Sequence, residues 1–410
     1  MISDRVKNIE LSKTLAVDAK AKAMKKEGID VVGFGAGEPD FETPHYIRDA
    51  GIEALNKGFT KYVPTLGIPE LRSIISDKLK NENKADYSPD EIIVSAGAKQ
   101  IIYEAILATI NPKDKVLIPD PWWVSYVPIV KMAQGIPVFL PTTEENEFKL
   151  IPETIEEKIT DKTKLIIINS PNNPTGSMLD RSDLQKIANI CIDFDIIALS
   201  DEIYEKLVYD GNEHVSIASF DGMKERTITV NGFSKAYAMT GWRLGYAGAP
   251  LQVIKGMDKI QAHSVSSATS IVQYAGVTAL KQKSDELAKM VSEFKKRRDF
   301  LVKRVNEIKG LHCVKPKGAF YAFVNISEHL DEVTQNSAEF SEWLLEKGLV
   351  AAVPGSAFGE CGEGFMRLSY ATSMENISKG LDRIEAALKN KTLTPPVLGN
   401  RYSYFLNNLS

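Results

Sequence analysis

The chain has 410 residues, of which 43% are hydrophobic and 25% are charged, so it can bury one large core or two adjoining cores. Its formal net charge of −4 gives no electrostatic reason to expect binding to nucleic acid or to an anionic membrane. The three cysteines are widely separated and the five histidines lack metal-ligand spacing, which argues against a disulfide framework and against a metal site.

The N-terminus lacks the apolar core of a signal peptide, and no run approaches the roughly 20 apolar residues of a membrane-spanning helix. We therefore expect a soluble protein of the reduced cytoplasm. A strand-like run over 29–32 leads into the glycine-rich segment from Gly33 to Gly37. This segment is not Gly-x-Gly-x-x-Gly, and Pro39 follows where a helix should begin, so we do not expect a nicotinamide site.

Strand-like and helix-like segments alternate from about residue 48 to about residue 280, which predicts a mostly parallel sheet covered by helices. The strand-like run 91–95 is followed by Gly97, Ala98 and Lys99 at the start of an apolar helix pattern. Unpaired N–H groups at such a helix start can bind an anion, helped by a macrodipole of about half a charge.

Three later apolar runs, 165–169, 196–200 and 227–231, have the composition of strands buried on both faces. Polar groups follow each run in turn: Asn173, then Asp201 and Tyr204, then Lys235 and Arg243. Because ligands of open α/β sheets bind outside the carboxyl ends of strands, we expect these groups to converge on one phosphorylated, heteroaromatic aldehyde. A lone lysine in a glycine-rich turn is usually a solvated side chain, but an amine at a strand end can be held against an aldehyde.

The last third of the chain changes character. A long charged helix pattern covers 284–309, a second helix pattern covers 337–347, and Arg367 lies in a strand-like run over 365–370. The final segment contains Pro395-Pro396 and an aromatic cluster, and we assign it no role.

Taken in order, these motifs resemble those of the class I and II aminotransferases, pyridoxal-phosphate enzymes of the aspartate aminotransferase fold, and most of all the bacterial and archaeal aspartate branch that often accepts prephenate. The resemblance runs from about residue 11 to about residue 388. It rests on Gly35 to Phe41, Lys61-Tyr62, Trp123 to Tyr126, Ser170 to Gly176, Asp201 to Tyr204, Ser234 to Arg243, and Met366 to Ser369.

The resemblance implies fold type I, which is an α/β fold: a large domain with a mostly parallel seven-stranded sheet, plus a smaller α+β domain. It assigns residues 46–283 to the large domain and residues 284–390 to the small domain. The N-terminal segment, residues 1–45, would join the small domain, and residues 391–410 would form a tail beyond the usual end of the family.

The resemblance also implies roles around the cofactor. Lys235 would bond to the aldehyde of pyridoxal 5′-phosphate and then move the proton at the substrate Cα. Asp201 would pair with the pyridine nitrogen, and Tyr204 and Asn173 would hydrogen-bond the phenolic oxygen. Trp123 would stack on the ring, although a tryptophan in this setting is more often part of a core.

In the family the phosphate binds to an arginine, to helix N–H groups and to a tyrosine of the other subunit, here Arg243, Gly97, Ala98 and Tyr62, so a homodimer is implied. Many relatives have a phosphate-binding serine where this chain has Gly232, and Ser234 is the candidate replacement. The substrate α-carboxylate would bind the forked guanidinium of Arg367 and the backbone N–H of Gly37.

Lys99, beside the cofactor phosphate, and Thr14 occupy positions that the related branch uses for acidic substrates and prephenate. We therefore expect an aminotransferase that moves the amino group of L-aspartate, or another acidic amino acid, to 2-oxoglutarate in a ping-pong cycle. The alternatives are a prephenate aminotransferase, a carbon–sulfur β-lyase and a non-catalytic pyridoxal-phosphate-binding protein, because the fold alone does not fix the reaction. The expected partners are amino-acid and 2-oxo-acid substrates, without nucleic acid, membrane or metal.

Overall fold

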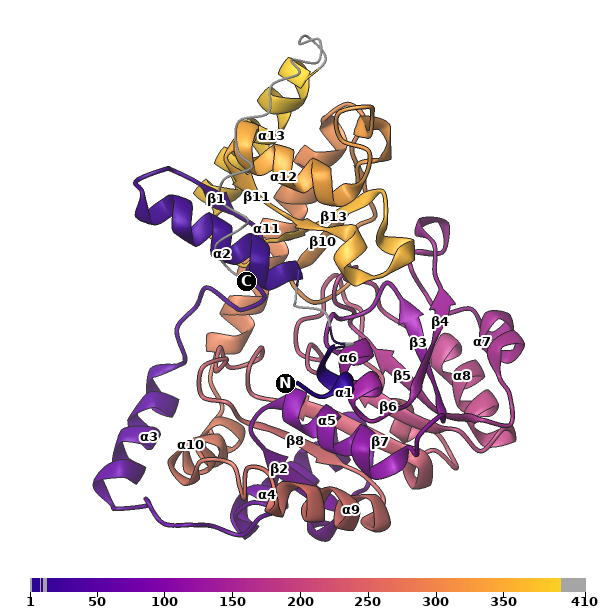
Figure 1. Cartoon of the computed structure of the whole chain (residues 1–410). Helices are drawn as coiled ribbons and strands as arrows, with labels where there is room; N and C mark the ends of the chain where they lie inside the picture. Colours follow the sequence, from indigo (N-terminus) through magenta and orange to yellow (C-terminus); the bar gives the residue numbers. More distant parts are fainter. Residues whose placement is uncertain (1, 8, 10–12, 392–410) are drawn as a thin grey trace.

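The computed structural model describes residues 2–7, 9 and 13–391 of the chain. A large sheet with its helices occupies the lower part of Figure 1, and a smaller sheet with its helices lies above it. Among the described helices, none combines the length and the apolar composition needed to span a bilayer.

The large sheet has seven strands in the order β2-β8-β7-β6-β5-β3-β4. Its strands are β2 (Ile92–Ser95), β3 (Lys115–Asp120), β4 (Ile136–Pro141), β5 (Thr163–Asn169), β6 (Ile197–Asp201), β7 (Thr227–Gly232) and β8 (Gly245–Gly248). Only β8 runs antiparallel to its neighbours β2 and β7, and the other neighbouring strands are parallel. The predicted mostly parallel seven-stranded sheet is therefore confirmed.

Side chains of the central strands of the large sheet are buried on both faces, as the continuous apolar runs predicted, whereas the edge strand β4 is largely exposed. Val116 and Ile118 of β3 belong to the core formed with the helices on one face, α5 (Ala98–Thr109), α6 (Tyr126–Met132) and α9 (Leu251–Ala262). Leu117, between them, belongs to the core with α7 (Pro152–Lys158) and α8 (Arg181–Asp193). This alternation follows from the two-residue period of a strand.

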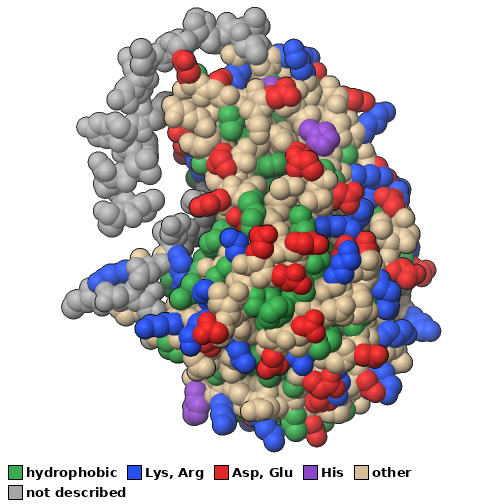
Figure 2. Space-filling view, turned by 90° about the vertical axis from the view of Figure 1, so that its right-hand side faces the viewer, with side chains coloured by type: hydrophobic (Ala, Val, Ile, Leu, Met, Phe, Trp, Pro, Cys, Tyr) green, Lys and Arg blue, Asp and Glu red, His purple; other side chains and the backbone are tan. Residues whose placement is uncertain are grey.

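A third group of helices packs beyond β2 and β8, at the lower left of Figure 1: α3 (His45–Asn56), α4 (Pro69–Lys78) and α10 (Ser270–Lys281). A π-helical turn, Leu79–Asn83, continues α4. Exposed faces of the molecule carry both signs of charge, and Figure 2 shows Lys and Arg interspersed with Asp and Glu over one of them.

The small sheet has four strands in the order β12-β13-β10-β9. They are β12 (Val353–Pro354), β13 (Phe365–Ser369), β10 (Tyr321–Asn325) and β9 (His312–Cys313), and they share a core with α11 (Glu286–Glu307), α12 (Ser337–Gly348) and α13 (Met374–Lys391). The N-terminal segment adds α1 (Asp4–Lys7), α2 (Lys13–Lys26) and β1 (Val32–Gly33), and β1 pairs in parallel with β11 (Val350–Ala351). The domain limits stay a prediction.

Several element boundaries differ from the sequence prediction. The strand expected over 29–32 is the two-residue β1, and Glu91 precedes β2 instead of starting it. Glu91 lies outside the strand because its carboxylate accepts a hydrogen bond from the N–H of Ser88 (2.9 Å), which closes a short 3₁₀ turn before β2. Of the predicted tail, residues 391–410, only Lys391 is described, as the last residue of α13, and the rest falls outside the described residues.

Candidate active site

The predicted strand-end groups line one cavity of about 930 Å³ between the large sheet and the small sheet. Its lining includes Gly37, Ala98, Lys99, Trp123, Asn173, Asp201, Tyr204, Ser234, Lys235, Arg243 and Arg367. The strands explain this convergence, because β5, β6 and β7 are parallel neighbours and their carboxyl ends meet at one edge of the sheet.

Asp201 ends β6 and is buried, with 4% of its surface exposed. Its Oδ2 accepts a hydrogen bond from the hydroxyl of Tyr126 (2.6 Å), and its Oδ1 accepts one from the N–H of Ile203 (3.3 Å). Burial raises the pKa of Asp201 to about 6, although these hydrogen bonds oppose the rise. A cationic or proton-donating partner in the cavity would therefore stabilise the charged form of Asp201.

Lys235 follows β7, and its Nζ donates a hydrogen bond to the backbone oxygen of Gly37. Burial lowers the pKa of Lys235 to about 8, and the positive charges of Arg367 and Arg243 act in the same direction. More of the amine is therefore in the free-base form near neutral pH than for an exposed lysine. A free-base amine is the form that attacks an aldehyde carbon.

Arg243 lies over the start of α5, where a phosphate was expected. Its Nη1 donates to the oxygen of Thr240 (2.7 Å) and its Nη2 donates to the oxygen of Ala96 (3.3 Å). Gly97 caps α5 with a φ of +88°, and a Cβ added there would lie 2.5 Å from Arg243 Nη2. The glycine therefore leaves room for the guanidinium at the start of the helix, where the N–H of Gly97 donates to the oxygen of Ser95 (2.7 Å) and the N–H of Gln100 donates to the oxygen of Gly97 (3.0 Å).

Gly232, where many relatives have serine, is crowded by the adjacent strand. A Cβ at this position would lie 3.1 Å from both the Cα of Gly245 and the oxygen of Leu244. The close approach of β7 and β8 therefore accounts for a glycine here. Ser234, the candidate replacement, is 8% exposed and lines the cavity.

Arg367 reaches the cavity from β13 of the small sheet. Its Nη1 donates to Asn173 Oδ1 (2.9 Å), and its Nη2 donates to the oxygen of Gly35 (2.8 Å). The guanidinium also lies 4.4 Å from the ring centre of Tyr321, whose hydroxyl is 2.9 Å from that of Tyr204. A buried, forked cation in this position can bind a carboxylate through two parallel hydrogen bonds.

Comparison with known proteins decides the family. Residues 29–384 match the sequence profile of the family described as aminotransferase class I and II. The chain belongs to this family. The predicted resemblance and the predicted enzyme class, an aminotransferase, are confirmed.

Individual relatives match over nearly their whole length. A probable aspartate/prephenate aminotransferase of Aquifex aeolicus is 46% identical over 391 residues, which cover 95% of this chain and 98% of that protein. The aromatic aminotransferase structure from Pyrococcus horikoshii has a TM-score of 0.86 at 45% identity, covering 91% of this chain and 100% of that one. The structure of Thermus thermophilus aspartate aminotransferase with maleate has a TM-score of 0.90 at 39% identity, covering 94% of this chain and 99% of that one.

In this aminotransferase, Lys99 stands in the first turn of α5 with its Nζ 5.0 Å from the ring centre of Trp123. Burial lowers the pKa of Lys99, and the charge of Arg243 adds to the effect. Trp123 in turn contacts Tyr126 edge to face, with ring centres 5.2 Å apart. Burial and the nearby positive charge of Arg243 both disfavour the charged form of Lys99, so an anionic ligand in the cavity would stabilise this ammonium group.

Two of the predicted site residues, Gly97 and Tyr62, are not among the described residues that line this cavity. Tyr62 does not line it and is 94% exposed, so the structure leaves the predicted contact across a dimer untested. Thr14 lies in α2, and its side chain is outside the described part of the chain. Conversely, Tyr126 and Tyr321 were not predicted as site residues, although Tyr126 ends one of the motifs.

α5 also carries a buried carboxyl group, that of Glu104. It is fully buried, its Oε1 accepts hydrogen bonds from Gln100 Nε2 (2.9 Å) and Ser95 Oγ (3.3 Å), and its Oε2 has no partner among the described residues. Burial raises the pKa of Glu104 from 4.5 to about 7. The folded chain therefore favours the protonated form, whose stabilisation is complete below the unfolded pKa and is lost as the pH rises through the folded value.

We expect Glu104→Gln, which is neutral at every pH, to be more stable than the parent at pH 8 by roughly 1–3 kcal/mol and nearly equal to it at pH 5. Urea unfolding at the two pH values measures the difference. Glu156→Gln, at an exposed position of α7, is the matched control and should change stability little at either pH. A gain of the same size at pH 5 and pH 8 would contradict the buried-acid interpretation.

Proposed function

We propose that this aminotransferase holds pyridoxal 5′-phosphate in the cavity and transfers the amino group of L-aspartate, or another acidic amino acid, to 2-oxoglutarate. One observation carries the proposal: a buried carboxylate, a partly buried amine and an arginine over a helix start line the same cavity, namely Asp201, Lys235 and Arg243. These are the partners that the ring nitrogen, the aldehyde and the phosphate of one such molecule require.

The residues present fit the cofactor at each of its polar groups. Asp201 offers a hydrogen-bond acceptor. Burial disfavours its negative charge, and a protonated ring nitrogen would stabilise that charge by pairing with it. Gly97 leaves room for the guanidinium of Arg243 at the start of α5, so a phosphate there would meet both this cation and the positive end of the helix dipole. When bound, pyridoxal 5′-phosphate supplies an electron sink for the charge that develops at the substrate Cα.

The chain's own residues supply binding and proton transfer. The hydrogen bond from Tyr126 fixes the carboxylate of Asp201, so its charge is already oriented when the ring nitrogen arrives. With the cofactor bound, Lys235 would serve as the general base that takes the proton from the substrate Cα and as the general acid that returns it. Tyr204, held by Tyr321, and Asn173, held by Arg367, are placed to donate to the phenolic oxygen.

An acidic substrate is supported by the two cations that flank the cavity. Arg367 would bind the α-carboxylate together with the backbone N–H of Gly37, and Lys99 would bind the side-chain carboxylate. The Thermus thermophilus relative was solved with maleate, a dicarboxylate, and the Aquifex aeolicus relative is named for aspartate and prephenate. Thr14 remains a proposed contact for the same substrates.

We expect Lys99→Ala to lower kcat/KM for aspartate and glutamate by about 1–3 kcal/mol while leaving neutral donors such as alanine nearly unchanged. The reason is that the contact exists only with a second carboxylate. Coupled assays with an acidic and a neutral donor measure the difference. Equal losses for both donors would show that Lys99 supports α5 instead of selecting the substrate.

Prephenate is the second candidate acceptor, because the Aquifex aeolicus relative is named for it. A panel of amino donors against 2-oxoglutarate, oxaloacetate and prephenate tests both functions together. Release of pyruvate and ammonia from cystathionine without an acceptor would instead indicate a β-lyase.

We also propose a cytoplasmic homodimer in which Tyr62 of each subunit reaches the phosphate of the other. The extreme exposure of this large side chain, 94%, supports a covering partner.

A further inference from the structure

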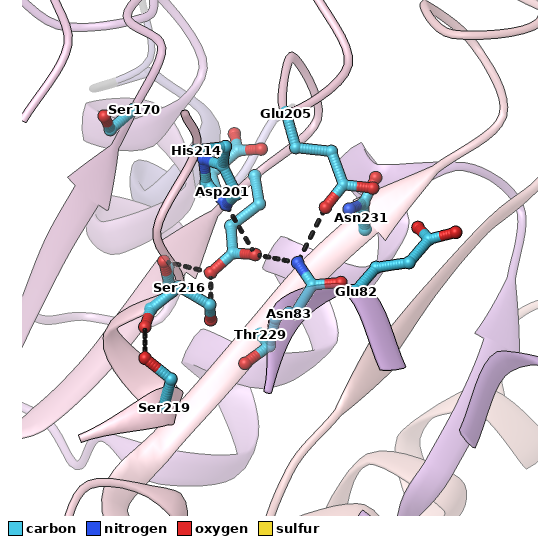
Figure 3. A network of polar contacts seen from close by, with 12 residues as sticks. Glu82, Asn83, Ser170, Asp201, Glu205, His214, Ser216, Ser219, Thr229 and Asn231 are labelled. Carbon is cyan, nitrogen blue, oxygen red and sulfur yellow. Dashed lines mark hydrogen bonds and ion pairs between the residues drawn. The ribbon is translucent and has the colours of Figure 1, made fainter. Parts of the chain in front are cut away.

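A buried polar network surrounds the side chain of Glu202, the residue after Asp201. Figure 3 shows Asn83, Glu205, His214 and Ser216, which belong to it. Glu202 is 1% exposed, and its Oε1 accepts hydrogen bonds from Ser216 Oγ (2.6 Å) and Ser200 Oγ (3.0 Å). Its Oε2 accepts one from Asn83 Nδ2 (2.8 Å) and lies 3.0 Å from His214 Nε2. These bonds anchor Glu202 to β6, to the loop after it and to the π-helical turn.

A second carboxylate, that of Glu205, shares the network and already has a cation. Lys78 Nζ is ion-paired to Glu205 Oε1 and also donates to Asn83 Oδ1 (2.7 Å). Asn83 Nδ2 in turn donates to Glu205 Oε2 (2.7 Å), so the asparagine bridges the two carboxylates. Figure 3 shows Asn83 between Glu205 on one side and the Ser216 and His214 region on the other.

Lys206 is already paired with Glu82 (2.7 Å), so among Glu202, Glu205, Lys78 and His214 the charges balance when His214 is a cation. Glu202 and Glu205 carry two negative charges, and Lys78 supplies one positive charge. His214 is the remaining basic group in contact with Glu202, and its side chain is 10% exposed. Although burial acts to lower it, the carboxylates of Glu202 and Glu205 raise the pKa of His214 above its ordinary value.

A metal ion is the other way to neutralise these groups, since ligand atoms of Glu202, Glu205 and His214 lie within 4.8 Å of one another. The contacts favour a proton. Both oxygens of Glu205 already accept from Lys78 or Asn83, and both oxygens of Glu202 are occupied by the donors described above.

We propose that His214 is a positioning residue for Asp201: it holds the positive charge that balances Glu202, so that Asp201 alone presents net negative charge to the cofactor ring. The proposal rests on the proposed function. Without that charge, the carboxylate of Glu202 disfavours ionisation of Asp201, because two adjacent negative charges repel each other in a buried site.

Other charged and titratable groups face the two residues. Around Asp201 they are Tyr126 on α6, Tyr204 after β6 and Lys235 after β7. Around the network they are Glu82, Tyr87, Lys206, Tyr237 and Tyr246. Each of these groups is kept in every variant below, so a change in titration reports on Glu202 and His214.

The first experiment measures the charge of His214 directly in the holoenzyme, by NMR of protein labelled at the histidine Cε1 carbons. The chain has five histidines, and the signal missing from His214→Gln identifies the one at position 214. We expect this signal to keep the chemical shift of a protonated imidazole at pH 7. A signal that titrates at or below the ordinary value of about 6.5 would overturn the proposal.

The second experiment follows the pH titration of the visible absorption of the holoenzyme, which reports proton affinity at the Lys235 nitrogen. His214→Gln keeps a donor but removes the charge, and should raise the midpoint by roughly 0.5–1 pH unit. Glu202→Gln should lower the midpoint, and the double variant should return it toward the parent value. Ser216→Ala, the control, removes a hydrogen bond to Glu202 without a charge and should leave the midpoint unchanged.

Shifts of the same sign in the two single variants would show a structural disturbance and refute charge balance. Failure of the proposed function looks different: the parent protein would then show no visible absorption, whereas the NMR signal of His214 would still report the charge. Far-ultraviolet circular dichroism of each variant confirms that it is folded.

Discussion

We expect Lys235→Ala to lose both the visible absorption of the purified protein and its aminotransferase activity, with turnover reduced by at least about 10⁴-fold. The magnitude combines loss of the covalent anchor with loss of the general base, and the latter alone contributes about 10²–10⁴. No other lysine among the described residues follows a central strand into the cavity beside Asp201. Absorption spectra and single-turnover kinetics of the two proteins measure the effect.

Lys99→Ala is the matched control, since Lys99 lines the same cavity but is proposed to touch only the substrate side chain. This variant should keep the visible absorption. An unchanged spectrum in Lys235→Ala, or loss of the band in both variants, would refute the assignment of Lys235 as the anchor.

The second large effect is expected at Arg367. Arg367→Ala should lower kcat/KM by roughly 2–5 kcal/mol for every amino donor, acidic or neutral, because all of them carry the α-carboxylate. The cost is high because the guanidinium is 3% exposed and a carboxylate without it would be buried unpaired. Steady-state kinetics with aspartate, alanine and an aromatic donor measure the loss.

Arg367→Lys keeps the charge but loses the fork and should recover only part of the activity. Its losses should again be similar for all donors. A loss confined to acidic donors would show that Arg367 binds the side-chain carboxylate of the substrate and that another residue binds the α-carboxylate.

Much of this site is visible in the sequence because each group follows a buried strand directly. The apolar runs before Asn173, Asp201 and Lys235 predicted strands, and parallel strands end at a common edge, so convergence followed from the pattern alone. The helix start after β2 was predictable for the same reason. The family resemblance rests in addition on the order of the motifs along the chain, which cannot be seen from any single strand end.

The supporting contacts were not predictable, because they depend on side chains that meet only in the folded chain. Tyr126 donates to Asp201 across 75 sequence positions, and the hydroxyls of Tyr204 and Tyr321 meet across 117. In the sequence Tyr126 and Tyr321 have the pattern of ordinary core residues, and nothing in the sequence around Tyr204, although it was predicted as a site residue, indicates its partner. The same holds for His214, whose partner is identified only by distance.

The hydrogen bonds of Arg367 make carboxylate binding an exchange reaction. Before a substrate arrives, the guanidinium already donates to Asn173 Oδ1 and to the oxygen of Gly35, so a ligand displaces acceptors instead of filling empty ones. The cost of breaking these hydrogen bonds is the same for every ligand, and a carboxylate offsets it better than an uncharged group because its hydrogen bonds to the guanidinium are stronger. A bound carboxylate would also take the place of Asn173 Oδ1 at Arg367, so substrate binding would alter the contact that holds Asn173 beside the cofactor site.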